Sequence, residues 1–511
     1  MNKRLLGLLV LFASGCASNT AQWPLAAWSP ATNPEQWLEN GRVQAERLAA
    51  GWPQARRAKN VILFIGDGMG VSTVTAARIF EGQLAGRSGE ENFLSFERFP
   101  YTALIKTYEV DQQVPDSAGT MTAMMTGVKT NAGLIGLDQT ARRGDCASAR
   151  VAIRRTLLEE AEQEGLATGI VTTTRLTHAT PAATYAHVPD RDWESDADLP
   201  QAAKEAGCRD IARQLIEFPY GDGPEVALGG GRQKFLPNQV HDPEYPNQSG
   251  SRQDGRNLLQ EWQLRPNSAY VWNKEQFDAV DPAKIDRLLG LFEPSHLKYE
   301  RDRLLDQGTE PSLSEMTAKA IQILKKSPKG FFLMVEGGRI DHAHHAGNAY
   351  RALTETIELA HAVEVAMQLT DPRETLIVVT ADHSQPLVLA GYPKRGNPIL
   401  GKVRDGRGEI AKAADGLPYT ALSYANGRGA HLLPEGGDAV FAEKIHAGRF
   451  DLRQVDPTHP GYHQEALVPL EASTHAGEDV PLYAAGANAH LFRGVLEQHV
   501  ICHLLRQAAG F

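Results

Sequence analysis

The stretch richest in chemically useful side chains is Phe331 to His345, which reads FFLMVEGGRIDHAHH. Its apolar half predicts a buried strand, and the glycine pair after Glu336 predicts a turn into a helix. Asp341 and His345 are four positions apart, so a helix would place both on one face, where they can bind a single ion. The two histidines between them would point elsewhere. The stretch therefore predicts one half of a metal site.

The same pattern of a strand followed by Asp or His recurs along the chain. One such residue alone is more often a turn former or a helix cap. In open α/β sheets, however, the carboxyl ends of neighbouring strands gather at the edge where ligands bind. The recurrence therefore predicts one site for several metal ions, built from distant parts of the chain. The pattern occurs at VILFIGDGMG (Asp67), at TLIVVTADHS (Asp382 and His383) and, after a weaker strand signal, at STHAGED (His475).

A hydroxyl nucleophile is suggested by VPDSAGTMTAMMTGVKTNAG, residues 114 to 133. Asp116 is well placed to cap a helix that starts at Ser117, and capping alone is the simpler interpretation of an Asp-Ser pair. The functional interpretation is a Ser117 hydroxyl at a helix N-terminus, where backbone N–H groups favour an anion. No histidine lies close in sequence to act as a base, but an adjacent metal ion could lower the pKa of the hydroxyl.

Further polar candidates lie in RLTHATPAATYAHVPDRDW, residues 175 to 193. Thr180 offers an oxygen to a hard cation such as Mg²⁺, and His178 is a candidate for a position just outside the ligands. The planar guanidinium of Arg191 suits a phosphate group. Taken singly, each of these is more often a turn or surface residue.

The elements that must position these residues alternate between strand and helix patterns, which predicts an α/β fold. Strands are predicted at 59–67, 167–174, 331–335 and 375–380. Helices are predicted at 34–50, 151–164 and 350–369. From 391 to 473 the composition shifts to Gly, His and Pro with few apolar runs, which indicates an insertion.

Length and composition are those of an ordinary globular protein. The chain has 511 residues, of which 42% are hydrophobic and 22% charged. Such a chain buries a large core, and its length favours two to four domains. The net charge is -10, and no basic tract is present that could neutralise many phosphates. Nucleic acid is therefore not expected as a binding partner.

The N-terminus has the pattern of an export signal. Lys3 and Arg4 precede the apolar run LLGLLVLFA, which is too short to span a bilayer, and Cys16 follows two small residues. The pattern resembles a bacterial lipoprotein signal peptide over 1–15, with a lipid on Cys16 and a tether over 16–33. Ala13 stands where that motif usually has Leu, so ordinary secretory cleavage nearby is the alternative. We expect an exported protein, either periplasmic or an outer-membrane lipoprotein.

Export permits disulfides. Apart from Cys16, the chain has three cysteines, an odd number that permits one bridge and one free thiol. We favour a bridge between Cys146 and Cys208, with Cys502 a small buried hydrophobe in an apolar C-terminal helix.

Several motifs together resemble the alkaline phosphatase family, over residues 59 to 507 and in the order of the family. They are FIGDGMG, VPDSAGTMTA, VTTTRLTHATPAATYAH, VEGGRIDHAHH, TADHS and THAGEDV. WESDADLP, VALGGGR, DPEYP and GLFEPSHLKYE resemble the branch with the animal tissue enzymes, as does His178 where other members carry Asp. The resemblance implies a three-layer αβα sandwich with a large, mostly parallel sheet over 34–390 and 474–511, a crown-like insertion over 391–473, and a homodimer.

The resemblance also implies metal ligands, which agree with the chemistry of the side chains because nitrogen-rich sets suit zinc and oxygen sets suit magnesium. One Zn²⁺ would bind Asp341, His345 and His475. A second Zn²⁺ would bind Asp67, Asp382, His383 and Ser117. Mg²⁺ would bind Asp67, Thr180 and Glu336, with His178 and Asp116 outside the ligand sets.

A Ca²⁺ site is implied for this branch as well. Its ligands would be Glu244, the carbonyl of Phe292, Glu293 and Glu310. The last position departs from the family, which has Asp there, and this chain has two extra residues before it. The paired cysteines of the branch match Cys146 and Cys208.

The activity that the resemblance implies is hydrolysis of small phosphate monoesters through a phosphoserine at Ser117, with Arg191 holding the phosphate. Two other classes compete with it. A phosphodiesterase or sulfatase of the same superfamily would share the metal-binding strands but usually has Thr or a modified Cys as nucleophile. A metal-stabilised binding lipoprotein would have the ligands without a nucleophile.

Overall fold

The computed structural model describes residues 33–49, 57–306, 309–432 and 445–510. The expected signal peptide, Cys16 and the expected tether up to residue 32 lie outside these ranges. Within them, no helix is both long enough and apolar enough to cross a membrane.

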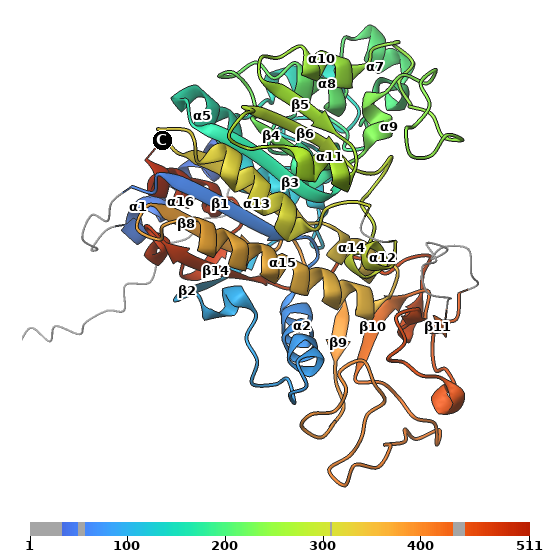
Figure 1. Cartoon of the computed structure of the whole chain (residues 1–511). Coiled ribbons are helices and arrows are strands. Elements are labelled where there is room, and N and C mark those ends of the chain that lie inside the picture. Colours follow the sequence, from blue (N-terminus) through green and yellow to red (C-terminus); the bar gives the residue numbers. More distant parts are fainter. Residues whose placement is uncertain (1–32, 50–56, 307–308, 433–444, 511) are drawn as a thin grey trace, which may run out of the picture.

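A ten-stranded sheet forms the centre of the molecule (Figure 1). Nine strands run in the same direction, and only β14 is antiparallel to both of its neighbours, β2 and β8. The expected large, mostly parallel sheet is thus confirmed. In spatial order the strands are β15 (Gly494–Glu497), β2 (Tyr101–Lys106), β14 (Val480–Gly486), β8 (Thr375–Thr380), β1 (Asn60–Gly66), β7 (Phe331–Gly337), β3 (Ala167–Arg175), β4 (Val226–Gly230), β6 (Arg287–Leu291) and β5 (Ser268–Val271).

Helices cover both faces of this sheet, as expected for three layers. On one face α13 (Leu313–Leu324) packs on β3, β4 and β7, and α15 (Ala349–Leu369) packs on β1 and β7. On the other face lie α5 (Leu157–Glu164) and α16 (Val500–Ala509), and α1 (Pro34–Ala49) packs against α16. Every residue of β7 and β8 is buried. Double coverage explains why the central strands are continuous apolar runs.

The predicted helix 151–164 was wrong in its first half. The structure instead has α4 (Cys146–Val151) and starts α5 at Leu157. Thr156 caps α5: its hydroxyl accepts from the N–H of Glu159, and the Glu159 carboxylate accepts from the N–H of Thr156. This reciprocal capping box fixes the helix start.

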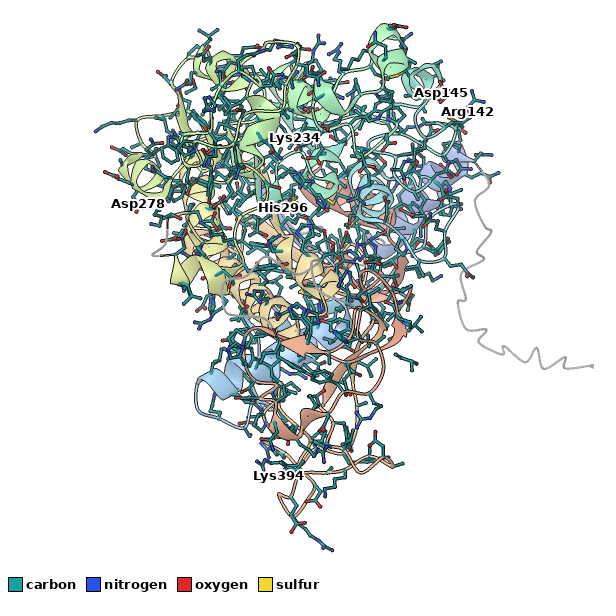
Figure 2. The ribbon with its side chains drawn as sticks, turned by 90° about the vertical axis from the view of Figure 1, so that its right-hand side faces the viewer. Arg142, Asp145, Lys234, Asp278, His296 and Lys394 are labelled. Carbon is teal, nitrogen blue, oxygen red and sulfur yellow. A yellow bond between two sulfur atoms is a disulfide. The ribbon has the colours of Figure 1, made fainter. Side chains whose placement is uncertain are left out.

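A smaller sheet lies away from the central one, at the lower right of Figure 1. It consists of β9 (Leu387–Leu389), β10 (Leu422–Gly427) and β13 (Ala466–Pro469), and two short strands, β11 (His431–Leu432) and β12 (Tyr462–His463), pair beside it. Figure 2 shows Lys394, from this region, at the opposite end of the molecule from Arg142 and Asp145. The crown-like insertion over 391–473 stays a prediction.

Candidate metal centre

The carboxyl ends of β1, β7 and β8 lie side by side and place three acidic residues at one edge of the sheet. Ile65 pairs with Glu336 of β7 and with Thr380 of β8. Asp67 and Asp382 follow immediately beyond the ends of β1 and β8. Gly68 adopts a positive φ of 69°, and a Cβ there would lie 3.1 Å from Asp341 Oδ1, so glycine permits this close turn.

His475 reaches the same edge by a different route from the one expected. It lies between β13 of the smaller sheet and β14 of the central sheet. Because β14 is antiparallel to β8, its amino end lies at the carboxyl edge of its neighbour. The expected strand before His475 exists as β13, but it belongs to the smaller sheet, and the central-sheet strand β14 comes after His475.

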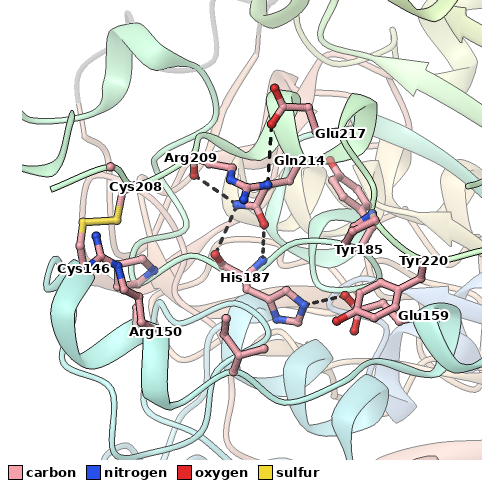
Figure 3. A pocket seen from close by; sticks show the side chains of 15 residues that line it. Cys146, Arg150, Glu159, Tyr185, His187, Cys208, Arg209, Gln214, Glu217 and Tyr220 are labelled. Carbon is pink, nitrogen blue, oxygen red and sulfur yellow. Dashed lines mark hydrogen bonds and ion pairs between the residues drawn. A yellow bond between two sulfur atoms is a disulfide. The ribbon is translucent and has the colours of Figure 1, made fainter. Parts of the chain in front are cut away.

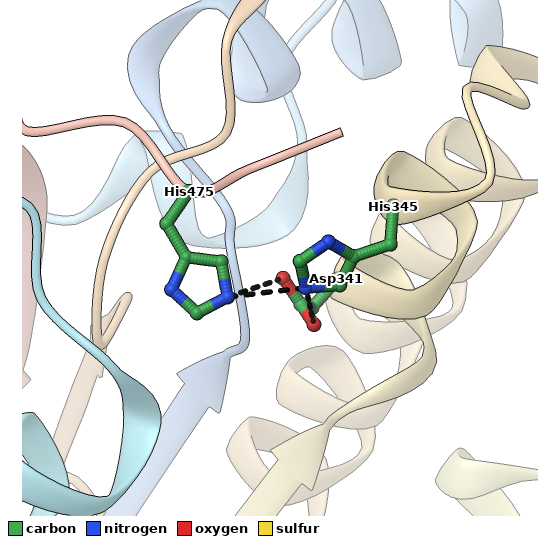
Figure 4. A group of neighbouring side chains, drawn as sticks. All are labelled: Asp341, His345 and His475. Carbon is green, nitrogen blue, oxygen red and sulfur yellow. Dashed lines mark hydrogen bonds and ion pairs between the residues drawn. The ribbon is translucent and has the colours of Figure 1, made fainter. Parts of the chain in front are cut away.

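Asp341, His345 and His475 form the first ligand group (Figure 4). Asp341 and His345 lie one turn apart on α14 (Arg339–His345). His345 Nε2 is 3.1 Å from Asp341 Oδ2 and 3.1 Å from His475 Nε2, and His475 Nε2 is 3.6 Å from Asp341 Oδ1. The three side chains therefore converge on one small volume.

Main-chain carbonyls orient the two rings of this group. Nδ1 of His475 donates to the carbonyl of Pro115 at 2.7 Å, and Nδ1 of His345 donates to that of Ser473. In the neutral rings, both Nε2 lone pairs then face inward, as metal-binding histidines require.

Asp67, Asp382 and His383 form the second group, and all three are fully buried. His383 Nε2 is 3.3 Å from Asp67 Oδ1 and 3.3 Å from Asp382 Oδ2. Its ring stacks on that of His475 with centroids 3.5 Å apart, which joins the first two groups. Ser117 Oγ lies 3.1 Å from His383 Nε2 and so faces this second group.

Asp67, Glu336 and His178 form the third group, so Asp67 belongs to two. His178 accepts from Arg191 Nη2 at 3.4 Å through Nε2. The proton of the neutral ring is then on Nδ1, which is buried and makes no hydrogen bond within the described residues. The expected place of His178 outside the ligands stays a prediction.

Unpaired polar atoms test whether these groups fit metal ions. Burying such atoms without partners costs free energy, so cations are the natural counterparts. Burial raises the pKa of Asp67 well above its ordinary value, and the carboxylates of Asp382, Asp341 and Glu336 raise it further. A pocket with this excess of negative charge fits bound cations. The buried atoms without a hydrogen bond include both carboxylate oxygens of Asp67, Asp382 Oδ2, Glu336 Oε1 and Thr180 Oγ1.

Ser117 is the first residue of α3 (Ser117–Thr126), and Asp116 caps this helix. Asp116 Oδ1 accepts from the N–H of Gly119 at 2.9 Å, and Oδ2 accepts from Arg191 Nη1 at 3.0 Å. One carboxylate thus fixes both the helix that presents the hydroxyl and the guanidinium beside it.

Two kinds of supporting residue were missed in the sequence. Thr172 and Thr174, on one face of β3, both donate to Glu336 Oε2 and leave Oε1 free. Gln385 donates its amide to Asp341 Oδ1. The sequence offered two signals, the threonine run TTTR at the end of the strand and the closeness of Gln385 to Asp382 along the chain. Neither signal identifies the residue that these side chains would contact.

Two of the expected calcium ligands already form ion pairs with basic side chains. Glu310 is 1% exposed, and within the described residues its Oε2 makes no hydrogen bond, which fits a cation. Glu293, however, already pairs with the Lys298 ammonium at 3.1 Å, and Glu244 with Arg232 Nη2 at 3.0 Å. In the described part of the chain, these glutamates are not among the tight ligand groups. The residues fit calcium only in part.

As expected, Cys146 and Cys208 form a disulfide, and Cys502 is free and buried. The disulfide lines a cavity of about 300 Å³ (Figure 3). There, His187 donates from Nε2 to Glu159 Oε1 at 2.6 Å and from Nδ1 to the carbonyl of Gly136 at 2.8 Å. Neutral imidazole has a single N–H, so this geometry requires the imidazolium.

Known proteins share this sequence and fold. The family model described as alkaline phosphatase matches residues 58–511. The chain is 47% identical over 486 residues to the tissue-nonspecific alkaline phosphatase of Gallus gallus, covering 93% of this chain and 89% of that one. To the Homo sapiens tissue-nonspecific isozyme it is 45% identical over 459 residues, covering 88% and 84%.

Solved structures agree on the fold. The Thermus thermophilus alkaline phosphatase aligns with a TM-score of 0.64 at 24% identity, over 95% of this chain and 96% of that one. The enzyme of the Antarctic bacterium TAB5 aligns with a TM-score of 0.59 at 22% identity, over 90% and 99%, and a variant of it has Mg bound in its M3 site. The match to the family model and the identity to the Gallus gallus and Homo sapiens relatives show that this chain belongs to the alkaline phosphatase family of enzymes.

Proposed function

We propose that this chain is an exported phosphatase that hydrolyses phosphate monoesters through a phosphoserine at Ser117, with two Zn²⁺ and one Mg²⁺. The observation that carries the proposal is the position of Ser117 Oγ. The hydroxyl lies 3.1 Å from His383 Nε2, at a helix N-terminus, and is buried beside two groups of metal-ligand type.

The residues assigned to each ion come from the three groups, with Ser117 and Thr180 added and His178 left outside the ligands. Asp341, His345 and His475 would hold one zinc, and Asp67, Asp382, His383 and Ser117 the other. Asp67, Thr180 and Glu336 would hold magnesium, an all-oxygen set of the kind that suits this ion. When bound, zinc lowers the pKa of a coordinated hydroxyl or water and neutralises charge on phosphate oxygens.

The chain's own residues then perform the group transfer. Ser117 gives its proton to solvent and its oxygen attacks phosphorus; the ester P–O bond breaks, and the leaving oxygen takes a proton from solvent and departs as the alcohol. Water then attacks the phosphoserine, the P–Oγ bond breaks, and one proton of that water passes to Ser117 as inorganic phosphate is released. Arg191 donates two N–H groups to nonbridging oxygens, which a dianionic monoester offers best.

Substitution of Ser117 tests the proposal. Ser117→Ala should lower turnover of a chromogenic phosphate monoester by about 10³-fold or more, as loss of a covalent nucleophile does in other hydrolases. The matched control is Ser88→Ala, at a serine whose hydroxyl donates to Glu91 Oε2 on the surface. Metal content should remain as in the wild type. Unchanged turnover in Ser117→Ala would remove Ser117 from the mechanism.

A second assay separates the competing classes. The metal-loaded enzyme would be given a phosphate monoester, a phosphate diester and a sulfate ester, each with and without a chelator. We expect the monoester to be preferred and the chelator to abolish its hydrolysis. Preference for the diester or the sulfate ester would favour a sibling enzyme, and no hydrolysis would favour a binding protein.

Three further parts of the proposal concern assembly and location: a homodimer, export to the periplasm or outer membrane, and a lipid on Cys16. Sedimentation of the purified protein tests the first. Mass spectrometry of the mature N-terminus distinguishes a lipid-modified Cys16 from ordinary cleavage nearby.

A further inference from the structure

The first two ligand groups are supported by different parts of the fold. The first group takes Asp341 and His345 from α14 and His475 from the segment before β14 (Figure 4). We call β9 to β13 the outer strands. They contact the last turn of α14, which carries His345. The chemistry proposed above gives these contacts no role.

His344 holds this turn from inside the core. Its ring is fully buried, and Nδ1 lies 2.7 Å from the hydroxyl of Tyr424 on β10. Nε2 lies 3.0 Å from Thr73 Oγ1 on α2 (Val71–Leu84). A neutral imidazole donates through one nitrogen and accepts through the other, and a hydroxyl can take either role. Both ring nitrogens are therefore satisfied by partners on two other elements, β10 and α2.

A second set of contacts lies just beyond the end of α14. His463 on β12 is buried and donates from Nδ1 to the carbonyl of Ala346 at 2.7 Å. The N–H of Gln464 donates to the carbonyl of Gly347 at 2.9 Å. The ring of His463 stacks on that of His431, its partner across β11, with centroids 4.0 Å apart. Since the last carbonyls of a helix have no partner inside it, the outer strands supply what α14 lacks.

The second ligand group depends on the central sheet instead. Asp382 Oδ1 accepts from the N–H of Gly68 at 3.1 Å and from that of His383 at 2.9 Å. The amide of Gln498, between β15 and α16, donates to the carbonyl of Asp382 at 2.6 Å. These donors all follow strands of the central sheet. Loosening the outer strands should therefore leave this group in place.

We propose that Tyr424 and His463 are positioning residues for the first zinc. Through the ring of His344 and the carbonyl of Ala346 they hold the turn that aims His345, so the outer strands set the affinity of this ion and not of the second. The inference deepens the metal assignment of the proposed function and rests on it.

The first group needs this support because its ligands come from two separate segments. His345 Nε2 lies 3.1 Å from His475 Nε2, and His475 is outside the helix. A small shift of the last turn of α14 would therefore open the group. Groups that directly orient a metal ligand typically change metal affinity about 10–100-fold when they are mutated. Tyr424 and His463 act through one intervening group, so we expect the lower end of this range.

A matched pair of variants tests the inference. Tyr424→Phe and Tyr185→Phe each remove one hydroxyl from a tyrosine that is 2% exposed. The hydroxyl of Tyr424 contacts His344, whereas that of Tyr185 donates to the carbonyl of Leu176 at 2.9 Å. Each protein is loaded with zinc and magnesium, and zinc release to an excess of a chromogenic chelator is resolved into one phase for each ion. His475→Ala lacks a ligand of the first ion and so identifies its phase.

The expected result is selective. In Tyr424→Phe the first zinc should leave about tenfold faster than in the wild type, while the second zinc stays within about twofold. Tyr185→Phe should match the wild type for both ions, because its hydroxyl does not contact α14.

His463 provides an independent readout. His463→Ala removes the donor to Ala346, whereas His463→Asn keeps an amide N–H near the position of Nδ1. Ala should speed the release of the first zinc about tenfold, and Asn should restore it to within about threefold of the wild type. Both variants lose the ring that stacks on His431, so an effect of the stack alone would appear equally in both.

Several outcomes would overturn the inference. Equal acceleration of both zinc ions in Tyr424→Phe would show a general loosening of the fold. Release at the wild-type rate in both Tyr424→Phe and His463→Ala would show that the outer strands do not support the first zinc. Equal losses in Asn and Ala would remove the hydrogen bond of His463 from the account. Failure of the proposed function looks different, since the wild type itself would then bind no zinc or leave the monoester intact.

Discussion

His345 and His475 point their Nε2 atoms at each other across 3.1 Å, while main-chain carbonyls hold both Nδ1 atoms. In neutral rings such an arrangement sets two lone pairs face to face. A bound cation would turn this repulsion into ligation, and Asp341 would be its third ligand.

His475→Ala should therefore remove one zinc and leave the other in place. His475 supplies one of three protein ligands to its ion, and His383 and Asp382 would still hold the second. Metal analysis after dialysis measures the stoichiometry. His241→Ala, at an exposed histidine, is the control. Full zinc occupancy in His475→Ala would contradict the assignment of the first ligand group.

Arg191→Ala should harm monoesters more than diesters. The guanidinium can donate to two nonbridging oxygens, and a monoester carries more charge on these oxygens than a diester does. Loss of a charge-assisted contact is worth about 2 kcal/mol, or roughly 30-fold in kcat/KM. Paired assays on a monoester and a diester measure the ratio. Equal losses on both substrates would count against the role of Arg191 in holding the nonbridging oxygens.

Removing the disulfide should lower stability without removing metals. The Cys146–Cys208 bridge closes a segment with a sequence separation of 62, for which chain entropy predicts about 4 kcal/mol. Denaturant unfolding of Cys146→Ser/Cys208→Ser against the wild type measures this difference. Cys502→Ser is the control, because it replaces a cysteine that is buried but forms no disulfide. Equal midpoints for the double variant and the wild type would leave the bridge without a stabilising role.

The pair of His187 and Glu159 should make stability depend on pH. Burial alone would lower the pKa of His187, but the hydrogen bond and charge of Glu159 outweigh it and raise the pKa in the folded state. The stabilisation is therefore complete below the unfolded pKa of about 6.5 and is lost as pH rises through the raised folded value. Unfolding of wild type and His187→Gln at pH 6 and pH 9 checks the sign. The gap between the two proteins should be larger at pH 6, and a gap that grows with pH would contradict the charged pair.

Calcium binding should be limited by Lys298. Its ammonium forms an ion pair with Glu293 at 3.1 Å, and its main-chain N–H donates to Glu310 Oε1 at 2.8 Å. Lys298→Gln removes a competing positive charge, so calcium affinity should rise by about tenfold or more. Equilibrium dialysis of radioactive calcium against the zinc- and magnesium-loaded proteins measures it. Tight binding in the wild type, unchanged in the variant, would show that Lys298 moves aside at no cost.

Much of the fold could be read from the chain itself. Long apolar runs such as VILFI and TLIVV predict buried strands because only a doubly covered sheet has no polar face. The helix at 350–369 was predicted nearly to its ends because its periodicity is long and uniform. The helix at 151–164 failed because a capping box at Thr156 decided its start, and local capping outweighs a continuing amphipathic pattern.

The sequence by itself determined which side chains are available for chemistry, because residue type and strand ends follow directly from order along the chain. Only the tertiary structure decided which side chains contact one another. Glu336 accepts a hydrogen bond from Thr172, and His475 comes just before an antiparallel strand, since both arrangements depend on how strands are ordered and directed in the sheet. Strand order and direction come from the packing of the whole core, which no short stretch of sequence encodes.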